Sequence, residues 1–379
     1  MREAGHRMPE NGGRLFNAGR RSSSHQPTGA GLMGTVRFLL AAIVVGFHCQ
    51  FGVIHQTIGG LAAVEVFYII SGFYMAAAYE RHYPGRPAAF FASRFARLYP
   101  FYLAVLAATF ALHLWNPANE SGIFNSLRTD ERPYVINLSL LGLDLYSAMH
   151  STTYLLVPQA WSISAEIVFY ALLPALLLLN RKWLAGLVVA AFTIKMTILH
   201  VYEWKWAYFP FYSQIGYFGT GVVLFSLRDR LTWSTRAGYW LAALYCLYLL
   251  GDVYADVDYH GGIVQGVPLV IATCIVIPTL FSRINGPLST ALGDASYGVY
   301  LSHFLFIQIA INLQFFDPIT LTNPHIVSHW RILFQTLGIL LASTVVALAF
   351  EFTLQRWIDR VRRSLFYNRR GPQDSFGKS

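Results

Sequence analysis

The chain has 379 residues, of which 55% are hydrophobic and only 12% are charged. A soluble domain carries about 25% charged residues, so this chain has too little charge to cover a water-facing surface, and an ordinary soluble fold is excluded. The net charge of +9 does not predict nucleic-acid binding, because the arginines and lysines lie between apolar runs in a pattern that membrane topology explains.

In chain order, the polar and basic residues 1–34, rich in Gly and Ser, are expected to form a disordered cytoplasmic tail. Apolar runs of about 18 to 22 residues follow, and each is long enough to span a ~30 Å hydrocarbon core. The apolar segment 134–147 is too short to cross and is expected to be re-entrant or interfacial. The predicted membrane spans are at about 36–54, 61–79, 97–114, 162–180, 183–202, 208–226, 237–253, 262–281, 296–315 and 331–354.

The distribution of basic residues supports this topology. Arginines such as Arg81, Arg94 and Arg181 fall in the loops predicted to be cytoplasmic, whereas the outside loops are acidic or nearly neutral. We therefore expect an all-α integral membrane protein, a bundle of about ten transmembrane helices with both termini cytoplasmic. The membrane domain is expected over 35–356, followed by a basic cytoplasmic tail over 357–379.

The three cysteines, Cys49, Cys246 and Cys274, lie inside apolar segments and have neither metal-ligand nor disulfide-framework spacing. They are interpreted as small buried hydrophobic residues. No span offers His or carboxylates at ligand spacing, so no metal cofactor is expected. The Asp256-Val257-Asp258 sequence is the D-x-D pattern of metal-using glycosyltransferases, but an acidic outside loop explains it equally.

Ionisable residues within the spans are candidates for function, because charge inside a bilayer is costly. Arg37 and His48 lie eleven residues apart in the first span, on one helix face and ~16 Å apart along the axis. Glu65 and Glu166 enter the second and fourth spans near the depth of His48. A histidine with carboxylates is suited to general acid–base catalysis, so these three residues are the catalytic candidates. A snorkelling arginine and a structural histidine remain the alternative.

A second group of candidates lies toward the cytoplasmic face. Arg94 and Arg97 are three residues apart and share a helix face. Together with Arg37 they are expected to form an arginine cluster suited to phosphate, unless they serve only as positive-inside residues. His303 lies about two turns inside the ninth span, where a structural contact with Glu351 is as good an explanation as a functional one.

Five segments of the chain carry a resemblance to a known family. They read RFLLAAIVVGFH from Arg37, VFYIISGFYM from Val66, RFARLYP from Arg94, WSISAEIVFYALLP from Trp161 and SYGVYLSH from Ser296. In this order, over about residues 35–355, they resemble the acyltransferase-3 family of membrane O-acyltransferases. The second segment departs from the family's frequent Phe-Phe, because Phe67-Tyr68 stands there with Glu65 two residues before it.

The resemblance implies an enzyme of the bacterial inner membrane that moves an acyl group, often acetyl, from cytoplasmic acyl-CoA to a hydroxyl. The implied acceptor is a sugar of a surface polysaccharide or glycolipid. It also implies that His48 is the catalytic residue and that Arg37, Arg94 and Arg97 handle the donor, with His303 as a further donor-binding candidate. The chain is expected to be the stand-alone form, without the fused esterase-like domain of some members.

Two other function classes remain as alternatives. A secondary transporter or exporter of a lipid-linked sugar also buries Glu, His and Arg, but transporters commonly show duplicated halves and broken helices, which we do not find in this sequence. A membrane glycosyltransferase rests on the lone D-x-D. The acyltransferase is the function that the sequence favours.

Overall fold

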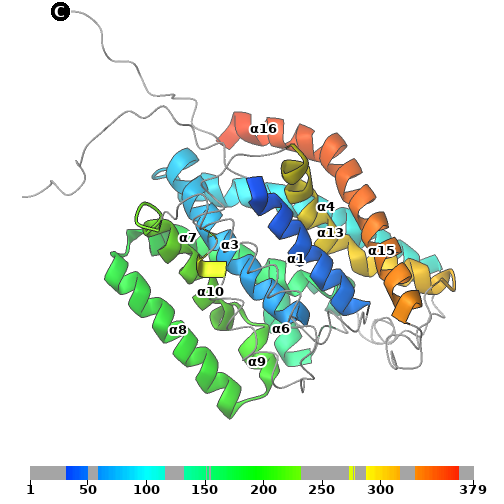
Figure 1. The fold of residues 1–379 in the computed structure, drawn as a ribbon, viewed down its shortest axis with the longest axis horizontal. Helices are drawn as coiled ribbons and strands as arrows, with labels where there is room; N and C mark the ends of the chain where they lie inside the picture. The colour runs from blue at the N-terminus through cyan, green and yellow to red at the C-terminus, as the bar shows by residue number, and fades with distance from the viewer. Residues whose placement is uncertain are drawn as a thin grey trace, which may run out of the picture.

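The computed structural model describes the chain as a bundle of helices (Figure 1). The described residues are 31–49, 59–115, 132–150, 152, 155–231, 273–275, 277, 287–315 and 329–366. Over these residues every regular element is helical, which agrees with the all-α prediction. Both predicted tails fall largely outside the described part, except that α1 already begins at Gly31 and the last helix runs to Phe366.

The helices are named in chain order. The long ones are α1 (Gly31–His48), α3 (Gly59–His82), α4 (Pro87–Trp115), α7 (Ala160–Leu178), α8 (Arg181–Val201), α10 (Phe211–Ser226), α13 (Pro287–Asn312) and α15 (His329–Phe350). The short ones are α5 (Arg132–Ser139), α6 (Leu143–His150), α9 (Trp204–Tyr208) and α16 (Arg356–Phe366), which a π-helical turn, η5 (Glu351–Gln355), joins to α15.

The long helices coincide with the predicted spans wherever the structure describes them. Within the described residues, five helices are long and apolar enough to cross a membrane: Gly60–His82, Pro87–Trp115, Ala160–Leu178, Arg181–Val201 and Trp330–Phe366. The protein is therefore a multi-pass membrane protein. The predicted span 237–253 lies outside the described residues, as does nearly all of 262–281, so the count of ten and the cytoplasmic placement of the termini stay predictions.

The segment predicted to be re-entrant or interfacial forms two short helices. Helices α5 and α6 have 8 residues each, or ~12 Å at 1.5 Å per residue, which is far less than a bilayer requires. Leu140 and Gly142, with φ of 57° and 79°, form the break between them. The prediction that this segment does not cross as one helix is confirmed.

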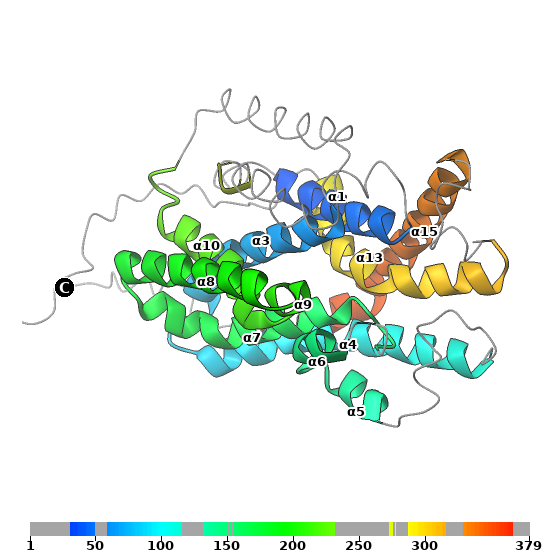
Figure 2. The same ribbon diagram turned by 90° about the horizontal axis from the view of Figure 1, so that it is seen from below.

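Close helix packing in the bundle depends on small residues. A Cβ on Gly72 of α3 would overlap the carbonyl oxygen of Phe218, and one on Gly221 of α10 would overlap the carbonyl oxygen of Ile69. Glycines let two helix backbones approach within a membrane bundle, and Gly72 and Gly221 do so where α3 packs against α10. Helices α8 and α15 lie on opposite sides of the bundle in both views (Figures 1 and 2).

The outer faces of these two helices are apolar, as a lipid-facing surface requires. Exposed side chains on α8 include Trp183, Val189 and Ile194, and on α15 they include Phe334 and Leu341. Apolar side chains that would be costly against water are at no disadvantage against lipid tails. By contrast, Ser71 of α3, Glu166 of α7 and Ser296 of α13 line a cavity inside the bundle.

Candidate active site

A cavity of about 800 Å³ opens between the helices and collects many of the predicted site residues. Helices α3, α4, α7 and α13 and the α15–η5–α16 segment contribute to its wall. Phe67 and Arg81, which both line it, are fourteen residues apart on α3, so the cavity extends over at least ~21 Å along that helix. It is lined by six arginines: Arg37, Arg81, Arg94, Arg97, Arg228 and Arg362.

Arg37, Arg94 and Arg97, the arginines of the cluster expected from the sequence, therefore all line this cavity. Arg94 is 9% exposed, and its Nε has no hydrogen-bond partner among the described residues. No carboxylate of the described residues forms an ion pair with Arg37 or Arg94, whereas Arg97 lies 3.7 Å from Asp294. Guanidinium groups that face a cavity without a carboxylate are free to bind an anion, and phosphate is the anion that arginine best fits.

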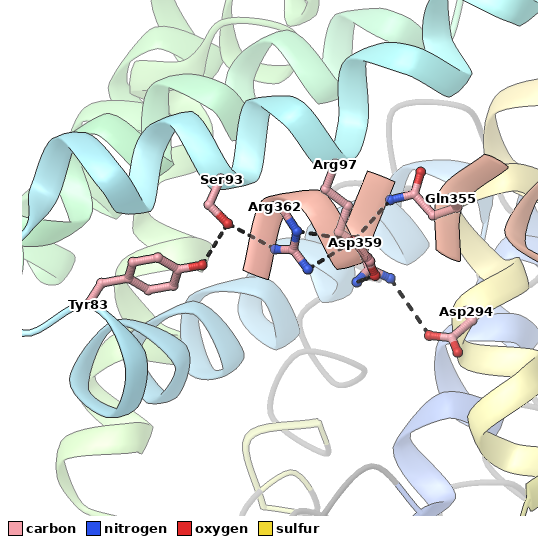
Figure 3. A network of polar contacts seen from close by, with 7 residues as sticks. All are labelled: Tyr83, Ser93, Arg97, Asp294, Gln355, Asp359 and Arg362. Atoms are coloured by element: carbon pink, nitrogen blue, oxygen red, sulfur yellow. Dashed lines mark hydrogen bonds and ion pairs between the residues drawn. The ribbon is translucent and has the colours of Figure 1, made fainter. Parts of the chain in front are cut away.

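A polar network lies beside the cavity, near the start of α4 (Figure 3). Arg362 of α16 donates through Nε to Asp359 Oδ1 at 3.1 Å and through Nη1 to Ser93 Oγ at 2.9 Å. Its Nη2 lies 3.0 Å from the same Asp359 oxygen, as an ion pair. Ser93 in turn is 2.6 Å from the hydroxyl of Tyr83. Asp359 also lies 3.8 Å from Arg97. The network therefore ties α16 to α4 and holds two cavity arginines.

The sequence analysis missed Arg362, because it falls in the segment 357–379 that was interpreted as a basic tail. Within that segment, the residues up to Phe366 form helix α16. The helix is ordered because Asp359 and Arg362 are buried, at 7% and 3% exposure, against the bundle. The three-residue spacing of these opposite charges, which suits one helix face, was the signal available in the sequence.

Glu166, a predicted catalytic residue, lines the middle of the cavity. It accepts hydrogen bonds from the hydroxyls of Ser71 and Tyr170. Ser71 comes from α3 and the other two residues from α7, so the carboxylate links these helices. Two hydroxyl donors hold the carboxylate in place, and all three groups stand in the cavity wall between the arginines and the far end.

His48 and His303 lie next to one another beyond that far end. His303 Nε2 is 3.1 Å from His48 Nδ1, and His303 Nδ1 is 2.6 Å from the carbonyl oxygen of Tyr300. The carbonyl fixes the hydrogen of His303 on Nδ1, which makes its Nε2 an acceptor for the Nδ1 hydrogen of His48. Val44 offers a second acceptor to the same hydrogen, at 3.0 Å. These partners assign the tautomers, with the ring hydrogen of His48 on Nδ1.

Tyr300 separates the histidines from the cavity. Its ring lines the cavity and lies 6.1 Å from both the Phe67 and the His303 rings. Its hydroxyl is held 2.7 Å from Ser162 Oγ. Neither histidine is among the described residues that line the cavity. His303, predicted to bind the donor, instead contacts His48, a position that suits orienting His48.

Glu65 does not join the other catalytic candidates. Its carboxylate is 2.6 Å from Lys195 Nζ of α8, and the two residues are 2% and 0% exposed. The same Nζ lies 4.7 Å from the Tyr217 ring. Similar depth made Glu65, His48 and Glu166 the catalytic candidates, but the carboxylate of Glu65 is paired with Lys195. Equal depth does not fix the direction in which a side chain points around its helix, and that direction decides the neighbours.

Lys195 is a second residue that the sequence analysis missed. It is a lone basic residue in the middle of the apolar run 183–202, and an ionisable residue in a span usually pairs with another. No group of three His, Cys, Asp or Glu side chains that could hold a metal occurs within the residues the structure describes. The D-x-D at 256–258 lies outside them.

Comparisons with known proteins agree with the sequence motifs. The acyltransferase domain family matches residues 33–355. BcsY of Komagataeibacter xylinus, named as a membrane-bound transacylase, is 28% identical over 299 residues, 74% of each chain. ExoZ of Rhizobium meliloti (strain 1021), named as an exopolysaccharide production protein, is 28% identical over 266 residues, 67% of this chain and 78% of its own. No solved structure matches. Because the domain match covers most of the chain, this protein belongs to the acyltransferase-3 family.

Proposed function

We propose that the protein transfers an acyl group, acetyl in the first instance, from acyl-CoA to a hydroxyl of a cell-surface or exported carbohydrate. The observation that carries this proposal is a ~21 Å cavity that has arginines at one end and a histidine pair just beyond the other. A coenzyme A thioester has matching ends, with phosphates on one side and the reacting carbonyl at the tip of a long arm.

The order of residues along α3 supports this donor orientation. Tyr74 faces the Arg37 region, Ser71 binds Glu166, and Phe67 contacts Tyr300 near the histidines. A diphosphate bound by Arg37 and Arg94 would place the pantetheine arm along Ser71 and Glu166. The thioester would then approach the Tyr300 end of the cavity, with a movement of that ring giving access to His48.

His48 is proposed as the general base, with Nε2 as the reacting nitrogen. It takes the proton of the acceptor hydroxyl while the hydroxyl oxygen forms a bond to the thioester carbonyl carbon. The carbon–sulfur bond then breaks, and the leaving thiolate takes the proton from His48, which restores the base. His303 keeps the His48 ring in the tautomer that this step requires. Glu166 is proposed to order Ser71 and Tyr170 along the donor arm.

The nature of the acceptor rests on the comparisons. ExoZ, one of the relatives, is named for exopolysaccharide production, which favours a polysaccharide or its lipid-linked precursor, and an enzyme of the bacterial inner membrane. The transporter alternative has less support than the sequence alone gave it, because the family is one of acyltransferases. A transporter would have used the buried Glu65–Lys195 pair, but we interpret this pair as an ion pair that stabilises the bundle.

The test uses purified protein in lipid with radiolabelled acetyl-CoA and crude surface glycan. We expect the wild type to transfer label to the glycan. In His48→Ala the rate of this transfer should fall at least a hundredfold, which is the lower end of the effect typical of removing a general base. His150→Ala, at the exposed end of α6, serves as the matched histidine control and should transfer normally. Normal transfer by a correctly inserted His48→Ala protein would refute the proposed role of His48.

A further inference from the structure

The proposed reaction places negative charge on the carbonyl oxygen of the thioester. The charge appears when the acceptor hydroxyl attacks the carbonyl carbon, and it disappears when the carbon–sulfur bond breaks. Hydrogen-bond donors aimed at such an oxygen usually supply the largest single part of the rate enhancement in acyl transfer. Because His48 is the proposed base, the donor has to lie at the histidine end of the cavity.

Tyr300 brings a hydroxyl group to that end. The residue lines the cavity and is 7% exposed, and its carbonyl oxygen is the group that fixes the hydrogen of His303 on Nδ1. A turn of the tyrosine ring about its Cβ–Cγ bond, which is a soft torsion, leaves the hydroxyl oxygen in place, because this oxygen lies on the axis of the bond. The ring can therefore turn to give access to His48 while the hydroxyl stays where it is.

Two neighbouring oxygen atoms hold the Tyr300 hydroxyl. It lies 2.7 Å from Ser162 Oγ and 3.3 Å from the carbonyl oxygen of Gln159, and Ser162 Oγ also lies 3.0 Å from that carbonyl oxygen. The two hydroxyl hydrogens thus have two arrangements. In one of them Ser162 donates to Tyr300, and the Tyr300 hydrogen points to the Gln159 carbonyl at 3.3 Å, a longer distance than the about 2.5–3.0 Å of a good O–H···O bond.

This second arrangement leaves the Tyr300 hydrogen weakly bound. A substrate oxygen that accepts it displaces only a long hydrogen bond, and the Gln159 carbonyl keeps the backbone N–H of Ser162 as a donor, at 3.3 Å. The bond that Ser162 donates polarises the phenol, which makes Tyr300 a stronger donor. Ser162 is only 4% exposed, so little water competes, and a hydrogen bond to a developing charge counts for more there than in water.

We infer that the Tyr300 hydroxyl donates a hydrogen bond to the thioester carbonyl oxygen in the transition state, and that Ser162 positions this hydroxyl. The inference rests on the proposed function, because it assumes that acyl transfer takes place at this end of the cavity. No proton leaves Tyr300. The charge on the oxygen returns to the carbonyl double bond as the carbon–sulfur bond breaks, and the thiolate takes its proton from His48.

The inference is tested by steady-state kinetics of acetyl transfer, with the full-length protein in lipid, radiolabelled acetyl-CoA and crude surface glycan. We expect Tyr300→Phe to lower kcat by about a hundredfold to a thousandfold, the loss typical of removing one such donor. The KM for acetyl-CoA should stay unchanged, because this hydrogen bond is strong only in the transition state.

Tyr102→Phe is the matched control. It removes another buried tyrosine hydroxyl, which donates to the carbonyl oxygen of Asn137. Tyr102 is not among the described residues that line the cavity, so this variant should keep the wild-type kcat.

Ser162→Ala tests the positioning role of Ser162. This variant should lower kcat less than Tyr300→Phe does, again with an unchanged KM. The double variant should be no slower than Tyr300→Phe alone, because Ser162 acts through Tyr300. Losses that multiply in the double variant would overturn the role of Ser162. If Tyr300→Phe fails to fold, Ser162→Ala still decides the matter, since a normal kcat in that variant would overturn the inference.

The outcomes separate the inference from the proposed function. A folded Tyr300→Phe protein with a normal kcat, or with a change in KM alone, would overturn the inference and leave the function standing. An equal fall of kcat in Tyr300→Phe and Tyr102→Phe would do the same, because it would trace the loss to packing. A wild type that transfers no label would overturn the proposed function itself.

Discussion

The buried ion pair between Glu65 and Lys195 gives the sharpest test of how the bundle is held together. At 2.6 Å and an effective dielectric constant of about 20, two unit charges attract by about 6 kcal/mol, and the cost of removing both from water offsets much of this. Replacing Lys195 alone by Met leaves the Glu65 carboxylate, 2% exposed, without its partner. We expect Lys195→Met to lower the free energy of unfolding by about 3–5 kcal/mol.

Replacing both charges should restore most of that loss. Well-packed apolar residues of similar volume commonly match or exceed a buried ion pair in stability, so the Glu65→Leu/Lys195→Met double variant should unfold within about 2 kcal/mol of the wild type. Reversible denaturation in mixed micelles, followed by tryptophan fluorescence, measures both variants. Glu80→Gln is the control, because the Glu80–Arg228 pair, at 3.3 Å, is largely exposed and should contribute no more than about 1 kcal/mol.

Activity of the double variant decides the role of Glu65. If Glu65 supports the bundle only, acyl transfer should return together with stability. A double variant as stable as the wild type but inactive would show that Glu65 takes part in the reaction, and the structural assignment would be wrong. A Lys195→Met variant no less stable than Glu80→Gln would refute the argument from burial.

Two further predictions concern packing and topology. Gly72→Ala should destabilise the protein by about 1–3 kcal/mol, because the new Cβ overlaps the Phe218 carbonyl oxygen. Gly186→Ala is the control and should be tolerated, because a Cβ at that position has no neighbouring atom within 4 Å. Equal thermal unfolding temperatures for the two variants would contradict this prediction. Lys182 and Glu203 are exposed and lie near the two ends of α8. Cysteines introduced at these positions should react with impermeant maleimide from opposite sides of the membrane, the cysteine at position 182 from the cytoplasm. Labelling of both cysteines from the same side would contradict the topology.

The sequence was most informative where local rules apply. The length of an apolar run and the charges at its ends decide whether it crosses a membrane, so the positions of α3, α4, α7 and α8 followed from the sequence. Arg37, Arg94 and Arg97, which the sequence placed at one end of their spans, all line the cavity, and their role in binding the donor stays a prediction.

The tertiary structure decided which side chains meet at a given depth. A sequence gives the depth of a residue in its span, but the rotation of each helix about its axis is set by packing against its neighbours. Glu65, a catalytic candidate because of its depth, therefore points to Lys195, while His303 reaches His48 from α13. Arg362 joins the cavity for the same reason, because the fold of α16 onto α4 is a long-range contact that no local pattern encodes.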